Sequence, residues 1–244
     1  MDLQKNIPIS AQKDRSRLKS GKGGIRLKRD KPSSAVIRRM PRYYRRLNEL
    51  HQSGVVRVSS GDLARSMGLT ASQIRQDLSC FGGFGQQGYG YNVEKLRGEI
   101  GDILGMNLGN TAIILGVGNL GRALMKNFSF ASHGFRLVAA FDTQASLIGT
   151  RINGVPVLDI AGLEAYLRTQ PVSVGILTVP QSAANETANR LVLAGVPGIW
   201  NFTNRDLNIP DADVVVENVH FGDSLLTLSY LIAHEETSEP QASS

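Results

Sequence analysis

The sequence contains a single cysteine and no long hydrophobic run. Cys80 alone cannot form an intramolecular disulfide or a cysteine-based metal site, so we expect no metal and a reducing compartment. As a lone thiol it is expected to pack as a small hydrophobic residue. No apolar stretch approaches the roughly 18 residues that a membrane span needs, and residues 1–32 lack the apolar core of a secretory signal. These absences predict a cytoplasmic protein without membrane contacts.

Acidic residues are scarce in the first part of the chain. Residues 1–31 hold ten Lys and Arg against three Asp and Glu, and residues 32–100 hold ten against five, whereas residues 101–244 hold seven against thirteen. Clustered cations that bind phosphates release counterions, so this distribution predicts a front part that binds a polyanion such as double-stranded DNA. We expect residues 1–33 to be a basic disordered arm, which can still strengthen DNA binding, and residues 236–244 to be a disordered tail.

Residues 34–106 are expected to form a winged-helix DNA-binding domain. Apolar residues recur at helical spacing from Ala35 to Ser53, and Pro41 is expected in the first turn of this helix. The apolar face that we expect to point inward consists of Val36, Ile37, Met40, Tyr43, Tyr44, Leu47 and Leu50. Two short helices follow, Leu63–Met67 and one from Ala71, and the glycine turn between them is typical of a helix-turn-helix.

Alternating aromatic residues and glycines between residues 81 and 91 predict a β-hairpin wing after the helix-turn-helix. A helix from Val93 to about Leu104 then ends the domain.

The second helix of the helix-turn-helix has the composition of a recognition helix. Short polar side chains and an arginine in its N-terminal part could reach base edges in the major groove. The base-reading residues that we expect are Ser72, Gln73, Arg75 and Gln76. The residues expected to bind phosphates and fix the register are Arg42, Tyr43, Arg46 and Ser60. Winged helices also serve as protein-docking modules, and this alternative stays open, although the basic charge disfavours it.

Residues 107–218 alternate apolar strands with amphipathic helices, a pattern that predicts a Rossmann domain with a doubly wound parallel sheet. The overall fold class is therefore α/β. The strands that we expect are 111–117, 135–141, 172–179, 198–202 and 214–216, with helices at 163–169 and 183–194.

A GxGxxG motif stands between the first expected strand and a helix, where a dinucleotide-binding loop belongs. Its residues are Gly116, Val117, Gly118, Asn119, Leu120 and Gly121. The glycines would permit a tight turn, the approach of a pyrophosphate and close helix packing, and the phosphates would lie on the helix N-terminus. Asp142, at the end of the second strand, could accept hydrogen bonds from ribose hydroxyls, which favours NAD(H) over NADP. Alternatively, the glycines serve packing alone.

Groups for hydride-transfer chemistry are scarce in the second domain. The four histidines, His51, His133, His220 and His234, have no evident orienting partner in the sequence. The remaining length also leaves no room for a substrate domain. We therefore expect no catalytic residues and no enzyme activity, and a bound nicotinamide would serve sensing.

The last expected helix, within residues 219–235, is apolar on most faces. It carries more large apolar side chains than one flank of a domain can bury, so we expect it to pack in a homodimer interface. These side chains are Leu225, Leu226, Leu228, Tyr230, Leu231 and Ile232.

Stretches spread in order over residues 34–235 resemble the signatures of the Rex family of redox-sensing transcriptional repressors. In the first domain they are Arg42-Tyr43-Tyr44-Arg45, Val58-Ser59-Ser60, Ser72-Gln73-Ile74-Arg75-Gln76-Asp77-Leu78-Ser79 and the segment from Phe81 to Val93. In the second domain they are Gly116–Gly121, Phe141-Asp142, Thr178-Val179-Pro180, Asn201-Phe202 and Val216-Glu217-Asn218-Val219.

The resemblance implies a homodimer that exchanges its C-terminal helix and binds an inverted-repeat operator. It also implies that NADH favours release from DNA, while NAD⁺ competes for the site and leaves the DNA-competent form populated. The further cofactor-binding residues that it implies are Thr178, Val179, Pro180, Asn201 and Phe221.

Three parts of the sequence depart from the family pattern. The family couples nucleotide binding to DNA binding through an arginine that matches Arg45 and an acidic residue at the position of His220. A tyrosine common at the end of the first Rossmann helix is replaced by Asn127, and Gln86-Gln87 stand in the wing where Lys or Arg is common. We therefore hypothesise that this regulator responds to NADH weakly or differently.

Two other functions remain open from the sequence. One is a small NAD-dependent oxidoreductase with an interaction head, which turnover of NADH with a carbonyl substrate would support. The other is a DNA-binding dimer with a vestigial nucleotide site, in which neither NADH nor NAD⁺ would bind.

Overall fold

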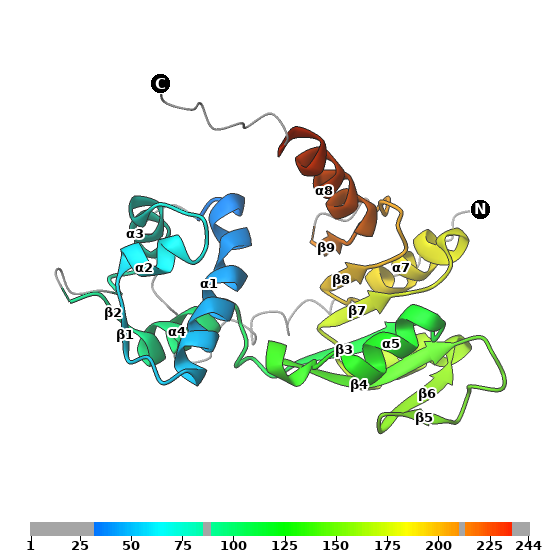
Figure 1. The fold of residues 1–244 in the computed structure, drawn as a ribbon. Coiled ribbons are helices and arrows are strands. Elements are labelled where there is room, and N and C mark those ends of the chain that lie inside the picture. Colours follow the sequence, from blue (N-terminus) through cyan, green and yellow to red (C-terminus); the bar gives the residue numbers. More distant parts are fainter. Residues whose placement is uncertain (1–31, 85–88, 210–212, 236–244) are drawn as a thin grey trace, which may run out of the picture. The chain divides into compact units, whose positions relative to one another are not determined.

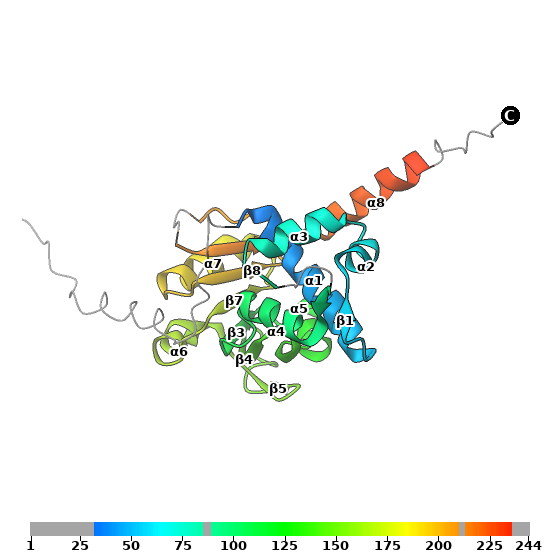
Figure 2. The same ribbon diagram turned by 90° about the vertical axis from the view of Figure 1, so that its left-hand side faces the viewer.

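The computed structural model describes residues 32–84, 89–209 and 213–235. The chain divides into two compact units, residues 1–105 and 106–244, and each is described here by itself (Figures 1 and 2). Residues 1–31 of the predicted arm, residues 85–88 of the predicted wing and the predicted tail lie outside the described residues. No helix among the described residues is long and apolar enough to cross a membrane.

In the described part of the first unit, the structure has four helices and a two-stranded sheet. In chain order these are α1 Ser34–Gln52, β1 Arg57–Val58, α2 Ser60–Arg65, α3 Ala71–Ser79, β2 Tyr91–Asn92 and α4 Val93–Ile103. Each helix begins after a side-chain cap, because an oxygen of the preceding residue accepts a hydrogen bond from a backbone N–H of the first turn. The capping residues are Ser33, Ser59, Thr70 and Asn92.

Helix α1 differs from its prediction at two positions. Pro41 lies inside the helix and not in its first turn. Its missing N–H leaves the carbonyl of Ile37 without an intrahelical partner, and that residue faces outward with 51% of its surface exposed. Ile37 was therefore wrongly assigned to the inward face, whereas Met40, Tyr43 and Leu47 are fully buried in the core of the unit.

The strands β1 and β2 form an antiparallel pair that returns the chain to the core. Arg57 lies opposite Asn92, and Val58 lies opposite Tyr91. Gly90 at this pair has a φ of +68°, and a side chain there would meet the carbonyl of Val58. The pair lies at the base of the predicted wing, and residues 85–88 of that wing are not described.

The second unit contains a seven-stranded sheet with helices between its strands (Figure 1). The strands are β3 Asn110–Leu115, β4 Phe135–Asp142, β5 Arg151–Ile152, β6 Val155–Asp159, β7 Val174–Leu177, β8 Gly198–Asn201 and β9 Val215–Asn218. The helices are α5 Asn119–Asn127, α6 Leu163–Thr169, α7 Ala184–Leu193 and α8 Phe221–Glu235.

The strands lie in the order β5-β6-β4-β3-β7-β8-β9. All neighbours are parallel except β5 and β6, which pair antiparallel at the edge. Counted along the parallel strands, this is the 3-2-1-4-5-6 order of the Rossmann fold, whose winding reverses between β3 and β7. The α/β fold class and the doubly wound sheet are therefore confirmed.

Helices cover both faces of the sheet, as the alternation along β3 requires. Ile113 and Leu115 point to one face, where they share a core with Leu167 of α6 and Leu191 of α7. Ala112 and Ile114 point to the other face, where they share a core that includes Met125 of α5.

Within the described residues, no α-helix lines one part of the second face. A cavity of about 500 Å³ opens there, lined mainly by apolar side chains such as Ala112, Ile176 and Trp200 from the strands and Phe128 and Phe130 from the segment after α5. The last helix, α8, does not fill it, because its apolar side chains are exposed, with Leu226 at 71%. In Figures 1 and 2, α8 extends outward from the end of β9.

Candidate functional site

The glycine loop follows β3 at the point where the winding of the sheet reverses. Gly116 has a φ of +96°, and a Cβ there would lie 2.8 Å from the backbone of Thr178 on the neighbouring strand. A Cβ at Gly121 would overlap the carbonyl oxygen of Gly116. Both positions therefore require glycine, one for the turn and one for close packing of α5 on the strand.

Gly118 is different, because a Cβ there would meet no atom within 4 Å. The protein itself does not need glycine at this position, and the open space fits a group that approaches the backbone. Helix α5 begins directly afterwards, and no side chain caps its first turn. Its N-terminal N–H groups and its dipole thus favour an anion such as a pyrophosphate. The loop fits a dinucleotide.

Asp142 ends β4 beside this loop. Its Oδ2 accepts a hydrogen bond of 2.5 Å from the N–H of Val117, and its Oδ1 accepts one of 2.8 Å from the N–H of Gln144. The carboxylate therefore holds the loop in shape. Each of its oxygens keeps a further lone pair, which could accept a bond from a ribose hydroxyl.

The segment Thr178-Val179-Pro180 lies on the opposite side of the loop, after β7. Thr178 donates its hydroxyl to the carbonyl of Gly116, 2.6 Å away. Thr178 and Val179 are half-buried and Pro180 is exposed. The structure thus places the predicted residues of two separate segments against the glycine loop.

The side chain of Asn201, which the resemblance names as a cofactor-binding residue, is engaged within the protein. This side chain is 1% exposed. Its Nδ2 donates to the carbonyl of Arg205 and to Oδ1 of Asn218, both at 2.7 Å. Its Oδ1 accepts from the N–H and the hydroxyl of Thr203. All of its hydrogen-bonding positions are occupied, so Asn201 organises the loop after β8 and has no group left for a ligand.

The residues expected to couple the two sites lie in different units. Arg45 is exposed on α1, whereas Asn127 is the exposed last residue of α5. His220 precedes α8, and its Nε2 lies 3.1 Å from Oδ1 of Asp206. The next residue, Phe221, is mostly exposed, and its ring centroid lies 6.1 Å from that of Phe202. His220 thus has an acidic neighbour, although it is not acidic itself.

Helices α2 and α3 form the predicted helix-turn-helix, with Gly68 at a φ of +64° between them. Ser72, Arg75 and Gln76 of α3 are exposed. Arg75 also donates to the hydroxyl of Ser60 at the start of α2, at 3.0 Å. These side chains are available on the surface of α3.

Two of the predicted phosphate-binding arginines lie at the rim of a small polar pocket. Arg42 is exposed and donates to the carbonyl of Met67 at 2.9 Å. Arg46 is half-buried and pairs with Glu49 at 2.9 Å. Arg45 lines the same pocket. Three neighbouring cations on one helix make this surface suitable for an anion.

Tyr43, in contrast, cannot bind a phosphate, and that prediction is wrong. Its side chain is fully buried, and its hydroxyl donates to Oδ2 of Asp77 at 2.7 Å. The tyrosine belongs to the apolar stripe of α1, so its ring packs in the core and only the hydroxyl needs a polar partner.

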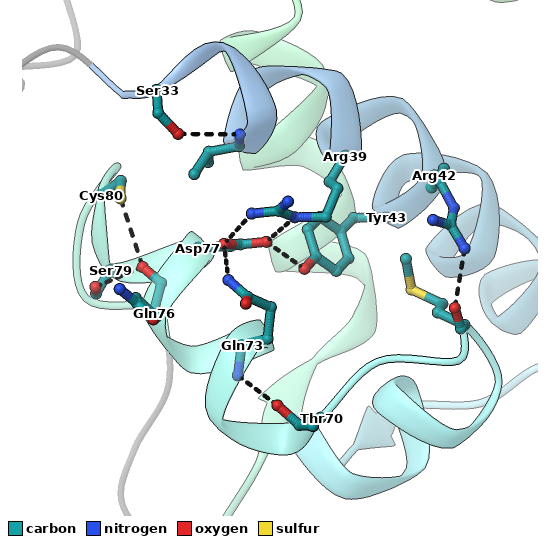
Figure 3. Close-up of polar contacts among 12 residues, drawn as sticks. Ser33, Arg39, Arg42, Tyr43, Thr70, Gln73, Gln76, Asp77, Ser79 and Cys80 are labelled. Carbon is teal, nitrogen blue, oxygen red and sulfur yellow. Dashed lines mark hydrogen bonds and ion pairs between the residues drawn. The ribbon is translucent and has the colours of Figure 1, made fainter.

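The partner of Tyr43 is a buried carboxylate that sequence reasoning did not assign to any site. Asp77 is fully buried and receives two hydrogen bonds from Arg39, at 2.6 and 2.8 Å, and one from Gln73 (Figure 3). Asp77 follows the core residue Ile74 by three positions, and this helical spacing signals an inward-facing acid. The network fastens α3 to α1.

Electrostatics keep this buried acid ionised. Burial raises the pKa of Asp77, but the hydrogen bonds from Arg39, Tyr43 and Gln73 outweigh it, so its pKa lies below the ordinary value. Burial, followed by the bond to Asp77, raises the pKa of Tyr43, which stays neutral.

Among the described residues, no group of three or more His, Cys, Asp and Glu could hold a metal ion.

Comparison with protein families gives one match for each part of the chain. Residues 32–79 match the family described as "Putative DNA-binding protein N-terminus". Residues 109–205 match the family described as "CoA binding domain".

Curated relatives match nearly the whole chain. A protein of Thermoanaerobacter pseudethanolicus named redox-sensing transcriptional repressor Rex is 51% identical over 209 residues, which cover 86% of this chain and 93% of that protein. A protein of the same name from Clostridium botulinum is 52% identical over 204 residues, covering 84% and 97%.

Solved structures agree in fold. RSP, described as a Rex-family repressor, matches with a TM-score of 0.78 and 47% identity, covering 85% of this chain and 97% of its own. The structure of RSP in complex with β-NAD⁺ and operator DNA matches with a TM-score of 0.79 and 50% identity, covering 85% and 95%. RSP in complex with β-NADH matches with a TM-score of 0.78 and 46% identity, covering 85% and 97%.

Proposed function

Because this chain belongs to the Rex family of redox-sensing transcriptional repressors, we propose that it represses transcription from an inverted-repeat operator and that NADH favours its release from DNA. The observation that supports the proposal is that a single chain carries both a candidate nucleotide site and a candidate DNA-binding site. The chain carries a glycine loop that fits a dinucleotide and a helix-turn-helix with exposed polar side chains. It is similar over 85% of its length to RSP, which is described with β-NAD⁺ and operator DNA and with β-NADH.

In this proposal the nucleotide changes the balance between two forms of the protein and is not consumed. A ligand shifts such a balance only by its excess affinity for one form. Here Gly118 gives the pyrophosphate access to the backbone, while Gly116 and Gly121 shape the turn and the helix packing. Asp142 holds the loop and accepts hydrogen bonds from the ribose hydroxyls.

The DNA-binding side chains act in two groups. Ser72, Gln73, Arg75 and Gln76 read base edges from α3. Arg42 and Arg46 bind phosphates from α1 and fix the register, and Ser60 supports Arg75 at the start of α2.

We propose that two copies exchange helix α8. The uncovered sheet face is apolar, and α8 exposes apolar side chains along its length, including Leu225, Leu228 and Ile232. A second copy of α8 on that face would bury both surfaces, which favours a symmetric dimer. The two-fold symmetry of such a dimer matches an inverted repeat.

We also propose that the protein acts in the cytoplasm and that it has no enzyme activity. Operator DNA lies in the cytoplasm of bacteria such as those of the relatives, so the protein acts there. It is a regulator and not an enzyme, since the relatives are named repressors, and this disfavours the oxidoreductase alternative.

The test is a selection of random DNA duplexes with the full chain, followed by release experiments. We expect enrichment of an inverted repeat and release of the selected duplex by NADH at concentrations at which NAD⁺ leaves it bound. Enrichment of no inverted repeat, or equal release by both nucleotides, would contradict the proposal. A chain that binds neither nucleotide in calorimetry would instead have a vestigial site.

A further inference from the structure

One of the side chains proposed to read bases donates a hydrogen bond to a buried acid. Gln73 lies one turn before Asp77 on α3, and its Nε2 donates to Oδ1 of Asp77 at 2.7 Å. Gln73 is half-buried, whereas Ser72, Arg75 and Gln76 are exposed. In Figure 3 the amide of Gln73 points toward the carboxylate of Asp77.

The carboxylate itself has no freedom to move with Gln73. Arg39 donates Nε to Oδ2 and Nη2 to Oδ1, and Tyr43 donates its hydroxyl to Oδ2. Both donors belong to α1, and Tyr43 is fully buried. The position of the carboxylate is therefore set by the core of the unit.

A carboxylate accepts hydrogen bonds and donates none, so it distinguishes the two ends of an amide. With Nε2 toward Asp77, Gln73 keeps its carbonyl oxygen and its second N–H for other partners. In the flipped orientation the carbonyl oxygen would face Oδ1 of Asp77, and two acceptors at this distance repel each other. The low pKa of Asp77 keeps it in this acceptor-only form at neutral pH.

We propose that Asp77 is a specificity-determining positioning residue, which fixes the amide of Gln73 so that α3 reads one adenine in each operator half-site. An amide that offers one carbonyl oxygen and one N–H complements the N6 donor and the N7 acceptor of adenine in the major groove. Asp77 itself is buried and does not contact DNA. This inference rests on the proposed function, because it assumes that α3 reads an operator.

The test uses the full chain and its operator, with each base pair of one half-site replaced in turn. Binding is measured by competition at constant salt, since salt changes the affinity for DNA as a whole. The variant Q73A identifies the position at which Gln73 discriminates between bases. At that position the wild type should prefer adenine by roughly 5- to 150-fold, the range expected for one bidentate contact.

The variant D77N should lose this preference while keeping the preferences at the other positions. An asparagine has one side-chain oxygen, and this oxygen would accept the hydrogen bonds from Arg39 and Tyr43. The side-chain nitrogen of the asparagine would then face Gln73 and favour the flipped amide of Gln73. The matched control is Y43F, which removes one hydrogen bond from Asp77 but leaves the carboxylate opposite Gln73. Y43F should keep the adenine preference even where it lowers stability.

Retention of the Gln73-dependent preference in D77N, or its loss in Y43F, would overturn the proposal. If D77N does not fold, the wild type decides the question with operators that carry 7-deazaadenine, which lacks the N7 acceptor, or purine, which lacks the N6 amine. Either analogue, placed at the position that Gln73 reads, should weaken binding by roughly 5- to 150-fold. If neither analogue weakens binding there, the proposal is overturned.

The side-chain amide of Gln73 gives a readout that does not depend on DNA. In amide NMR spectra of the free wild type, one of its protons should exchange with water more slowly than the side-chain protons of Gln76. Equal exchange would also overturn the proposal. If the amide is protected but no duplex is preferred, the operator function fails while the Asp77–Gln73 contact stands.

Discussion

The hydroxyl of Thr178 donates a hydrogen bond of 2.6 Å to the backbone carbonyl of Gly116 and so ties the end of β7 to the glycine loop. The bond crosses the point where the winding of the sheet reverses, between β3 and β7. The shape of the loop thus depends on a strand that comes some 60 residues later in the sequence.

Replacement of Thr178 by valine tests this tie. Valine has nearly the same shape but no hydroxyl, and a lost net hydrogen bond is worth about 1 kcal/mol. We expect T178V to bind NADH roughly fivefold more weakly in calorimetry. The control is T150V, because Thr150 donates a similar bond to the carbonyl of Leu147, outside the loop. Unchanged affinity in T178V would show that the loop keeps its shape without this bond.

A substitution at Gly118 should affect NADH binding but not the stability of the fold. A methyl group there meets no protein atom within 4 Å, so G118A should change the free energy of unfolding by less than about 1 kcal/mol. The same methyl group would stand where a pyrophosphate approaches the backbone, and we expect NADH affinity to fall more than tenfold. The matched control G162A is also in open space but away from the loop. An unchanged affinity in G118A would place the phosphates elsewhere.

The buried pair of Arg39 and Asp77 should matter far more for stability than a surface pair. Removing one partner of a buried ion pair costs about 3–5 kcal/mol, and we expect R39A to lose about 3 kcal/mol in urea unfolding followed by circular dichroism. Arg65, which is 81% exposed, pairs with Asp62 on α2. R65A should change stability by less than about 1 kcal/mol. Equal losses in the two variants would refute the structural role of Asp77.

The stability of the second unit should depend on pH through Glu164. Hydrogen bonds from Arg190 lower the pKa of Glu164 from 4.5 to about 2. A lowered pKa adds stability above pH 4.5, and that contribution disappears as the pH falls toward 2. E164Q should therefore be less stable than the wild type at pH 6 and should approach it near pH 2. Because Glu164 is 42% exposed, solvent screening keeps the effect small.

His220 stands where the family pattern has an acidic residue, and this difference gives a prediction for the response to NADH. The Nε2 atom of His220 lies 3.1 Å from Asp206, and the residue cannot supply the acid that the family pattern has before the exchanged helix. We expect H220D to make the release of operator by NADH sharper in mobility-shift titrations at several NADH/NAD⁺ ratios. D206N, which removes the neighbour of His220 without adding an acid, should not have this effect. Sharp release by the wild type at low NADH would contradict the hypothesis of an altered response.

Features set by short stretches of sequence could be predicted. The glycine loop, the two short helices of the helix-turn-helix and the end of the second strand at Asp142 all depend on neighbours within a few residues. The edge strand β5 and its neighbour β6 were missed. Strand β6 contains Pro156 and has little of the alternation that marks a strand.

The internal hydrogen bonds of Tyr43 and Asn201 were also missed, for a different reason. Each has a polar group whose partner is distant in the sequence or in a loop, Asp77 for Tyr43 and Asn218 for Asn201. A sequence pattern shows that such a group can bind something, but only the folded chain shows that a protein partner already occupies it.

The uncovered sheet face and the exposed apolar α8 have a consequence for the amount of protein in the cell. If each chain supplies the helix that completes the other, a lone chain exposes both surfaces to water, and folding becomes linked to encounter with a second copy. Dilution would then unfold the protein as effectively as mild heat. Two variants mixed during refolding would form heterodimers. A defective subunit would then also inactivate the intact subunit with which it pairs.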